Sequence, residues 1–317
     1  MLNQLPACVG KYKYVKTIGK GSSAVIGLYT HESTLSNVAI KFFDRKTVLE
    51  KDMLKYLEVE LRLISRLSHP YLPKIYEIQY TEDQILVIME YLPNGNLLDA
   101  LQESSEFTFQ KRVEMCYKII EALNYLHQRG IAHRDIKPEN ILIDSNFDPK
   151  IIDFGLSADN ADLKLKTFCG TSVYMAPEII KGKEYNGIKA DIWSFGVTAH
   201  IIMTRELPFE YNGEAKYIKD VKRGKIQLRS YCGGDLAKLF ASCLESDPEK
   251  RPTASELLDS LNRIMNELNI SKSFQTPVKK LLTPDRTFNK SVPAKKLILH
   301  LNGKIPTPFK LRKVGSV

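Results

Sequence analysis

Five polar residues with side chains suited to phosphate chemistry stand in three short motifs. "VAIK" carries Lys41 at the end of a strand-forming run, and "HRDIKPEN" holds Asp135, Lys137 and Asn140 in one polar loop. "IIDFGLS" then places Asp153 after an apolar run and before a glycine. Taken singly, the first motif could be a strand with a solvated lysine, the second a polar turn and the third the end of a strand. Chance does not readily explain all three in this order.

These residue types meet the needs of γ-phosphoryl transfer. The reaction needs a cation on the phosphate oxygens, oxygen ligands for Mg²⁺ and a carboxylate beside the incoming hydroxyl. We expect Lys41 to be the cation, Asp153 and Asn140 to be the metal ligands, and Asp135 to accept the hydroxyl proton. Lys137, two residues after Asp135, could reach the transferring γ-phosphate.

A glycine-containing stretch, "TIGKGSSAVIGLYT", precedes Lys41. Three interpretations are open for it: a damaged dinucleotide-binding fingerprint, a loop that covers phosphates, or an ordinary turn. The β-branched run after the glycines predicts a strand, whereas a dinucleotide-binding unit needs a helix there. We therefore expect a hairpin over the phosphates, with Ala24 where a third glycine would stand. Its nucleotide-binding residues are Gly19, Lys20, Gly21, Ser22 and Ala24.

Charge is distributed unevenly along the 317 residues, which carry a net charge of +9. From Ser271 onward there are eleven lysines or arginines and one acid, Asp285, so this tail carries +10 and the rest of the chain −1. The folded part is therefore not basic, which disfavours a nucleic-acid-binding protein. Prolines interrupt the tail and it has no sustained period, so we expect it to be disordered.

The sequence shows neither a signal peptide nor an apolar run long enough to span a membrane. Its five cysteines are scattered and form no C-x-x-C pair, which argues against a disulfide framework and a zinc knuckle. These features predict a soluble cytoplasmic protein with reduced thiols. The basic tail allows a nuclear-import signal as well.

The order of the expected elements predicts an α+β fold with two lobes. Residues 12–92 contain several strand-like runs and one main helix with apolar residues at helical spacing. Helical patterns dominate residues 93–268, where Thr253 and Glu256 form a capping box for the last helix. We expect a cleft between the small β-rich lobe and the larger helical lobe. Residues 1–11 are then an amino-terminal extension, and 269–317 are the basic tail.

Together these motifs resemble the signature set of eukaryotic-type protein kinases, over roughly residues 12 to 265. The resemblance continues through "YMAPE", "DIWSFG" and "DPEKRP", in which Arg251 matches the family arginine that pairs with Glu178. Lys137, Gly170 and Thr171 resemble the serine/threonine class, and the closest style is that of calcium/calmodulin-dependent-kinase-like enzymes. The resemblance implies a bilobal kinase fold and an ATP- and Mg²⁺-dependent enzyme that phosphorylates protein substrates in intracellular signalling.

Further roles follow from this resemblance alone. Glu60 matches the glutamate that ion-pairs with Lys41, whereas the alternative, a solvated helix face, fits Glu58 better. Met89 matches the gatekeeper of the hinge, and Glu90 to Leu92 would offer backbone hydrogen bonds to adenine. Three apolar residues match those that sandwich the base, with a simple core role as the alternative: Ile26, Ala39 and Leu142.

The resemblance also implies a switch between Asp153 and Glu178. Thr167 matches the activation-loop phosphorylation site, and Arg134 marks the type of kinase whose arginine receives that phosphate. The alternative is that Thr167 is an ordinary exposed threonine. An upstream activating kinase is a further expected partner. A proline-directed kinase is another, because the tail contains three Thr-Pro pairs, at Thr276, Thr283 and Thr307.

A kinase-shaped scaffold without catalytic activity is the rival from another class. It is disfavoured because the residues that carry the chemistry are all intact, whereas a scaffold is free to lose any of them. These residues are Lys41, Glu60, Asp135, Asn140 and Asp153.

Overall fold

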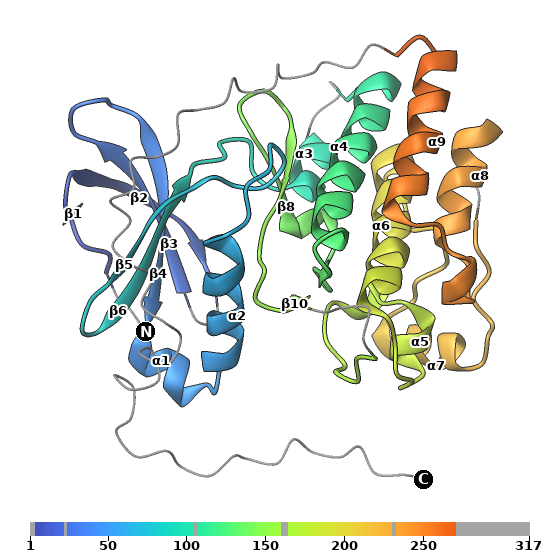
Figure 1. The fold of residues 1–317 in the computed structure, drawn as a ribbon, viewed down its shortest axis with the longest axis horizontal. Coiled ribbons are helices and arrows are strands. Elements are labelled where there is room, and N and C mark those ends of the chain that lie inside the picture. Colours follow the sequence, from blue (N-terminus) through green and yellow to red (C-terminus); the bar gives the residue numbers. More distant parts are fainter. Residues whose placement is uncertain (1–3, 22–23, 104–106, 160–163, 230–232, 271–317) are drawn as a thin grey trace. The chain divides into compact units, whose positions relative to one another are not determined.

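Strand-forming sequence near the amino terminus builds a six-stranded antiparallel sheet in the computed structural model (Figure 1). The structure describes residues 4–21, 24–103, 107–159, 164–229 and 233–270. The strands have the order β1-β2-β3-β4-β6-β5. They are β1 (Cys8–Val9), β2 (Tyr12–Lys20), β3 (Ala24–His31), β4 (Asn37–Asp44), β5 (Ile75–Tyr80) and β6 (Gln84–Glu90).

Apolar residues on both faces of the sheet give it two buried layers. Ile40 and Phe42 belong to one cluster, whereas the next residue, Phe43, belongs to the other, because successive strand residues point to opposite faces. The second cluster includes side chains of two helices, α1 (Arg45–Glu50) and α2 (Leu54–Ile64). The sheet therefore packs directly against the helix that carries Glu60.

The described residues before Tyr12 pack on the sheet, although the sequence places them outside the domain. Leu5 and Val9 are both 8% exposed and join the first cluster, and the Tyr29 hydroxyl donates to the carbonyl of Pro6 at 2.9 Å. Gly27 leaves room for this contact, since a Cβ there would lie 2.8 Å from Leu5 Cδ1 and 2.6 Å from Tyr29 Cε2. Burial of these apolar side chains explains why the segment follows the sheet.

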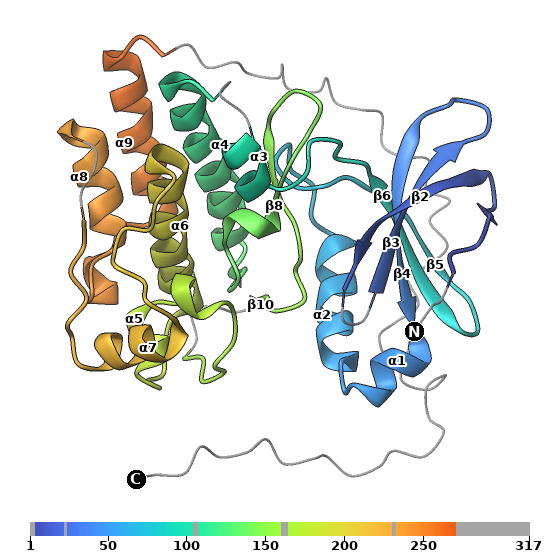
Figure 2. The same cartoon turned by 180° about the vertical axis from the view of Figure 1, so that it is seen from behind.

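After β6 the fold is mainly helical, which confirms the α+β architecture expected from the sequence. Helix α6 is buried nearly all round and lies between α4 and α8 at the centre of the largest core (Figure 2). The helices are α3 (Leu97–Glu103), α4 (Phe109–His127), α5 (Pro177–Ile180), α6 (Gly187–Thr204), α7 (Glu214–Lys222), α8 (Gly234–Cys243) and α9 (Ala254–Glu267).

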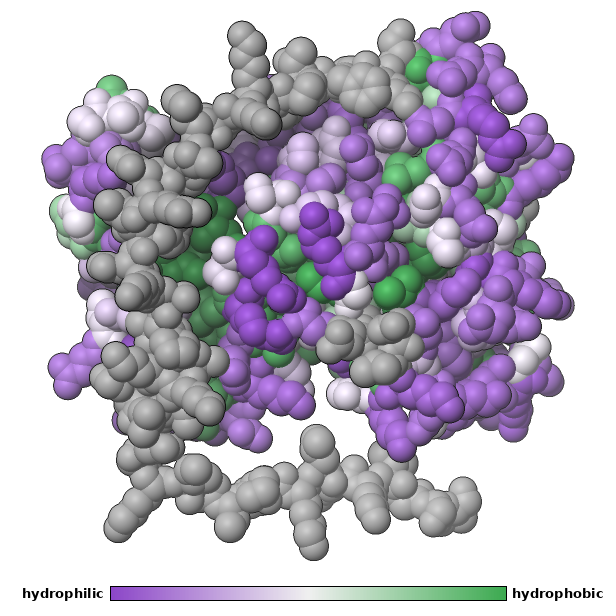
Figure 3. Space-filling model, in the orientation of Figure 1, coloured by the Kyte–Doolittle hydropathy of each residue, from purple (hydrophilic) through white to green (hydrophobic). Residues whose placement is uncertain are grey.

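Short elements between these helices carry most of the candidate site. Three single turns of 3-10 helix are η1 (Pro138–Asn140), η2 (Ser172–Tyr174) and η3 (Pro248–Lys250). Two antiparallel strand pairs are β7 (Ile131–Ala132) with β10 (Ala158–Asp159), and β8 (Ile141–Ile143) with β9 (Pro149–Ile151). Figure 3 shows that hydrophilic residues cover much of the helical lobe on the face drawn there.

Local sequence signals define both ends of the last helix, α9. Thr253 and Glu256 form the predicted capping box. At the other end, Asn269 has a φ of 53°, and the Ile270 amide donates to the Met265 carbonyl at 2.9 Å, as in a Schellman motif. Ile270 is 5% exposed, so the ordered packing continues two residues beyond 268, the predicted end of the domain.

Several expectations concern residues outside the described part of the chain. These are Ser22, most of the basic tail and its three Thr-Pro pairs. Among the described residues, no helix has both the length and the apolar character needed to cross a membrane.

Candidate active site

Lys41 and Glu60 form an ion pair that joins the sheet to α2. Lys41 Nζ lies 2.5 Å from Glu60 Oε1, and the two side chains are 17% and 11% exposed. Burial alone would lower the pKa of Lys41, but the charges of Glu60 and Asp153 outweigh it, and the pKa is raised. Lys41 is therefore held as a cation between carboxylates of both lobes.

Asp153 lies close to this pair in a conformation that most residues avoid. A Cβ built on Gly155 would lie 3.4 Å from Asp153 Oδ1 and 3.8 Å from Glu60 Oε2, so both carboxylates border Gly155. Asp153 has a φ of 67° and Arg134 a φ of 70°, both in the left-handed region. Such backbone costs about 1–3 kcal/mol per residue, and it is concentrated at functional sites.

The Asp135 carboxylate is held by hydrogen bonds on both oxygens. Oδ2 accepts from Lys137 Nζ at 2.8 Å and from Asn140 Nδ2 at 2.7 Å. Oδ1 accepts from the amide and hydroxyl of Thr171, at 3.2 and 3.3 Å. Lys137 Nζ also donates to Thr171 Oγ1 at 2.6 Å. In the sequence Thr171 is recognisable only as a marker of kinase class, and nothing there indicates its contact with Asp135.

Asp191 supports the loop that carries Asp135, and the sequence analysis gave it no role. Its side chain is fully buried in α6 and accepts from the amides of His133 and Arg134, each at 2.8 Å. His127 Nε2 lies 3.0 Å from the same carboxylate. A charged residue between the apolar Ala190 and Ile192 was the available signal, because a buried carboxylate needs hydrogen-bond donors.

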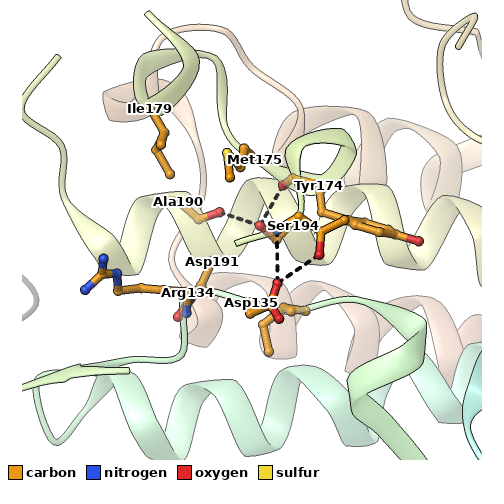
Figure 4. A pocket seen from close by; sticks show the side chains of 10 residues that line it. Arg134, Asp135, Tyr174, Met175, Ile179, Ala190, Asp191 and Ser194 are labelled. Atoms are coloured by element: carbon orange, nitrogen blue, oxygen red, sulfur yellow. Dashed lines mark hydrogen bonds between the residues drawn. The ribbon is translucent and has the colours of Figure 1, made fainter. Parts of the chain in front are cut away.

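A pocket opens beside Asp135 (Figure 4). Ser194 Oγ fixes one wall by donating to the carbonyls of Tyr174, at 2.8 Å, and Ala190, at 3.2 Å. The pocket therefore places a partly apolar surface next to the candidate proton acceptor. It is lined by Arg134, Asp135, Ile136, Thr171, Tyr174, Met175, Ile179, Ala190, Asp191 and Ser194.

The glycine-containing stretch forms the predicted hairpin of two strands, β2 and β3. Gly19 pairs with Ile26 and Lys20 with Val25, and the Gly21 amide donates to the Ala24 carbonyl at 2.8 Å. Ala24 is 8% exposed and belongs to the cluster shared with α1 and α2. Its methyl group is therefore part of the lobe's core.

The expected adenine-binding residues lie on neighbouring strands and on the segment after them. Ile26 pairs with Lys41 across β3 and β4, and Ala39 pairs with Met89 across β4 and β6. Val38 pairs in the same way with Glu90. Leu92 is 8% exposed, and Leu142 of β8 forms an isolated bridge with Asn96.

Glu90 makes a contact that the sequence analysis missed. Its Oε2 accepts from the Lys74 amide at 3.0 Å and from Lys150 Nζ at 2.9 Å. Lys150 belongs to β9, three residues before Asp153. The expected hinge is thus tied by its side chain to the strand that leads to Asp153.

Asn140 and Asp153 fit a divalent cation that takes most of its ligands from elsewhere. The Ile152 amide donates to the Asn140 carbonyl at 3.0 Å, which brings the loop of Asn140 against the residue before Asp153. Both side-chain hydrogen bonds of Asn140 use Nδ2, so neither uses its oxygen Oδ1. Mg²⁺ in phosphate-transfer sites is typically held by one or two protein groups plus phosphates and waters. The described residues contain no cluster of three or more His, Cys, Asp or Glu that could hold a metal by itself.

Arg134 lies beside the segment that carries Thr167. Its Nη2 donates to Cys169 Sγ at 2.5 Å, whereas its buried Nε has no hydrogen-bond partner among the described residues. Burial raises the pKa of the Cys169 thiol, although the charge of Arg134 opposes this shift. Thr167 is exposed, and its carbonyl accepts from the Tyr185 hydroxyl at 2.9 Å.

A buried ion pair between Arg251 and Glu178 holds the end of the segment that carries Thr167. Both Arg251 terminal nitrogens donate to the two Glu178 oxygens, each at 2.7 Å. Arg251 is 1% exposed and Glu178 is 7% exposed. This is the pairing that the kinase resemblance implies for these two residues.

Comparisons with known proteins agree with this geometry. The model of the protein kinase domain matches residues 12–261. CBL-interacting serine/threonine-protein kinase 8 of Arabidopsis thaliana is 34% identical over 251 residues, or 78% of this chain and 56% of that protein. Serine/threonine-protein kinase SIK1 of Mus musculus is 34% identical over 255 residues, or 80% of this chain and 33% of that protein. Maternal embryonic leucine zipper kinase of Xenopus tropicalis is 36% identical over 250 residues, or 78% of this chain and 38% of that protein.

The chain therefore spans about a third to just over half of the length of these relatives. All three are kinases of the calcium/calmodulin-dependent group, which confirms the group that the motifs resemble. The matched family model covers most of the chain, from the hairpin of Gly19 to helix α9. This chain belongs to the protein kinase domain family.

Proposed function

We propose that this protein is a serine/threonine protein kinase that transfers the γ-phosphate of ATP to hydroxyl groups of protein substrates. The observation that carries the proposal is the Lys41–Glu60 pair at 2.5 Å beside Asp153. This pair is a fixed cation close to the carboxylate that would bind the metal, and phosphoryl transfer requires both groups. The names of the relatives, which include serine/threonine-protein kinases, support the same class of reaction.

On the nucleotide side, Lys41 would bind phosphate oxygens while Glu60 keeps its ammonium group in place. Asp153 and Asn140 would hold Mg²⁺ through their side-chain oxygens. Bound Mg-ATP supplies the phosphoryl group and neutralises part of its developing charge. The β2–β3 hairpin would cover the phosphates, and Ala39 and Met89 would border the base.

On the acceptor side, Asp135 would orient the substrate hydroxyl and accept its proton. Its hydrogen bonds to Lys137, Asn140 and Thr171 keep the carboxylate in one orientation. Lys137 would also stabilise negative charge on the transferring phosphoryl group. Positioning and electrostatics of this kind supply most of the catalysis in phosphoryl transfer.

The test is transfer of labelled γ-phosphate from Mg-ATP to a generic protein substrate, after incubation with an activating kinase. Lys41→Met and Asp153→Asn should each reduce transfer by at least about a hundredfold, since each removes a charge used in the transition state. Chelation of divalent cations should stop the reaction, and added Mg²⁺ should restore it. Transfer that survives both substitutions would refute the site, and a phosphorylated wild type without transfer would favour a scaffold.

We further propose that phosphorylation of Thr167 activates the enzyme through Arg134. The buried Nε of Arg134, without a partner among the described residues, is available for an anion, and Nη2 donates to a weak acceptor, the sulfur of Cys169. A phosphate on Thr167 would replace that contact with stronger charge-assisted hydrogen bonds.

Thr167→Ala should therefore keep only basal transfer, and Arg134→Gln should lose most of the activation that phosphorylation produces. Charge-assisted bonds of this kind can change the rate by about tenfold or more. The control is Lys166→Gln, which removes a neighbouring exposed charge and should leave activation intact. If unphosphorylated Thr167→Ala matched phosphorylated wild type, the proposed switch would be wrong.

A further inference from the structure

Asp159 makes two ion pairs with α2 and the residues just after it. Asp159 Oδ1 lies 2.6 Å from Arg66 Nη2, and Oδ2 pairs with Arg62 Nη1 at short range. The Asp159 side chain is 19% exposed, whereas the arginines are 45% and 48% exposed. Each carboxylate oxygen therefore binds a different arginine, and the acid is the more buried partner.

The three residues connect parts of the fold that carry catalytic groups. Asp159 belongs to β10 and pairs with Ile131 of β7, and that strand leads directly into His133 and Asp135. Arg62 stands two residues after Glu60 in α2. Figures 1 and 2 both draw β10 beside α2. The ion pairs thus join the helix that positions Lys41 to the strand pair beside the candidate catalytic loop.

The same region of α2 lies between two cores, so its position depends on contacts in both lobes. Leu57 and Leu61 pack in the cluster under the sheet, whereas Leu63 belongs to the core of the helical lobe. Arg62 and Arg66 have an i,i+4 spacing and would repel each other without an acid between them. The Asp159 carboxylate attracts both arginines and so offsets their mutual repulsion, which favours the observed position of α2.

We propose that Asp159 is a positioning residue for the phosphoryl-transfer reaction, acting through Arg62 and Arg66 to hold α2 where Glu60 meets Lys41. The proposal rests on the kinase activity proposed above. Two residues then have different roles. Asp159 holds α2 on the nucleotide side, and Arg134 responds to the phosphorylation of Thr167 on the acceptor side. The α2 position is then maintained by a carboxylate within the chain, whether or not Thr167 carries a phosphate.

Asp159→Asn tests the idea because it keeps the shape of the side chain and removes its charge. We expect kcat to fall by about threefold to tenfold, with less than about a twofold change in KM for the protein substrate, because the competent position of α2 is less populated. Amide hydrogen exchange in residues 57–63 should be faster by a similar factor. Both changes are expected in phosphorylated and unphosphorylated protein.

Three further variants make the test specific. Arg62→Gln with Arg66→Gln should reproduce the effect, and adding Asp159→Asn to that pair should cause little further loss. Asp159→Glu should retain most of the activity. The matched control is Asp235→Asn, which breaks an exposed ion pair with Lys238 in α8 and should change neither kcat nor the exchange of α2.

The proposal requires the kinetic and the exchange effects together. It is overturned if Asp159→Asn changes only one of them, changes neither, or acts equally strongly when both arginines are already replaced. If wild type transfers no phosphate, the proposed kinase function fails, and the exchange measurement alone then decides whether Asp159 holds α2.

Discussion

Among the residues that the structure describes, those that hold the Asp135 carboxylate all belong to the helical lobe, whereas Lys41 depends on a partner that lies on a separate element, α2. The Asp135 carboxylate accepts four hydrogen bonds, from Lys137, Asn140 and Thr171. Lys41 forms an ion pair with Glu60 of α2, and α2 packs against the cores of both lobes. The acceptor side is therefore fixed by local contacts, while the nucleotide side is assembled only when α2 is in place.

The largest expected effect is on the acceptor side. Asp135→Asn keeps the shape of the side chain but removes the carboxylate that would accept the proton. General-base groups contribute about 10²- to 10⁴-fold to rate, so kcat should fall by about that factor, with little change in KM for ATP. Steady-state kinetics of labelled phosphate transfer would measure it. Activity within about tenfold of wild type would show that Asp135 is not the base.

The contact between the segment that follows α2 and helix α4 should depend on pH through His69. Its ring packs on Tyr125 of α4, with centroids 4.8 Å apart. Burial, followed by the charges of Arg129 and Lys150, lowers the pKa of His69 to about 4. Because the pKa of His69 in the unfolded chain is about 6.5, burial of the neutral ring contributes fully to stability above about pH 6.5. That contribution is lost as the pH falls through about 4.

The free energy of unfolding should fall by roughly 1–2 kcal/mol between about pH 7 and pH 4, less than the full pKa shift would give, because the ring is partly exposed and solvent screens its charge. His69→Phe keeps a ring at this position and removes the titration, so its stability should decrease less over the same range. Urea unfolding of both proteins at the two pH values measures the difference. Parallel pH dependences would mean that His69 does not titrate as described.

Glu60→Gln tests the nucleotide side directly. It removes the charge that holds Lys41, so burial should then dominate and lower the pKa of Lys41. A hydrogen bond to a charged group contributes about 1.5–3 kcal/mol, which corresponds to about a ten- to hundredfold fall in kcat/KM. Glu58→Gln, on the same helix, is the control and should be close to wild type. Equal effects of Glu60→Gln and Glu58→Gln would show that the role assigned to Glu60 is wrong.

The smallest expected effect is in the hairpin. Ala24→Gly removes a buried methyl group and adds backbone freedom worth about 0.5–1 kcal/mol, so KM for ATP should rise by about two- to fivefold at most. Gly21→Val should raise that KM more, although a Cβ at Gly21 meets only the Ala24 carbonyl, 3.6 Å away, among the described residues. Any large loss at Gly21 would therefore come from the nucleotide. Equal tolerance at both positions would show that this loop does not cover it.

Periodicity and motif spacing predicted the two lobes and several local features well. The strand runs, the capping box at Thr253 and the pairing of Lys41 with Glu60 all appear in the structure. These features depend on local pattern or on a family resemblance that specifies both partners. The packing of Leu5 over Gly27 could not be predicted from the sequence, because the residues around Leu5 give no sign that it contacts Gly27.

The same limit explains the contacts that sequence analysis missed. Asp191 accepts hydrogen bonds from the amides of His133 and Arg134, which lie far from it along the chain, and Asp159 is still more remote from Arg62. Each of these residues is charged, which was a usable signal. The partner, however, is set by how strands and helices from distant segments pack.

The sequence by itself determined which residues can carry the chemistry, because Lys41, Asp135 and Asp153 need only their functional groups and their order along the chain. Tertiary structure alone decided what holds those groups in place: Thr171 binds the Asp135 carboxylate, and the α2 helix that pairs with Lys41 packs against the cores of both lobes. The physical reason is that charges and hydrogen-bond donors act over a few ångströms. Only the folding of each lobe brings Thr171 within that range of Asp135, and Glu60 within that range of Lys41.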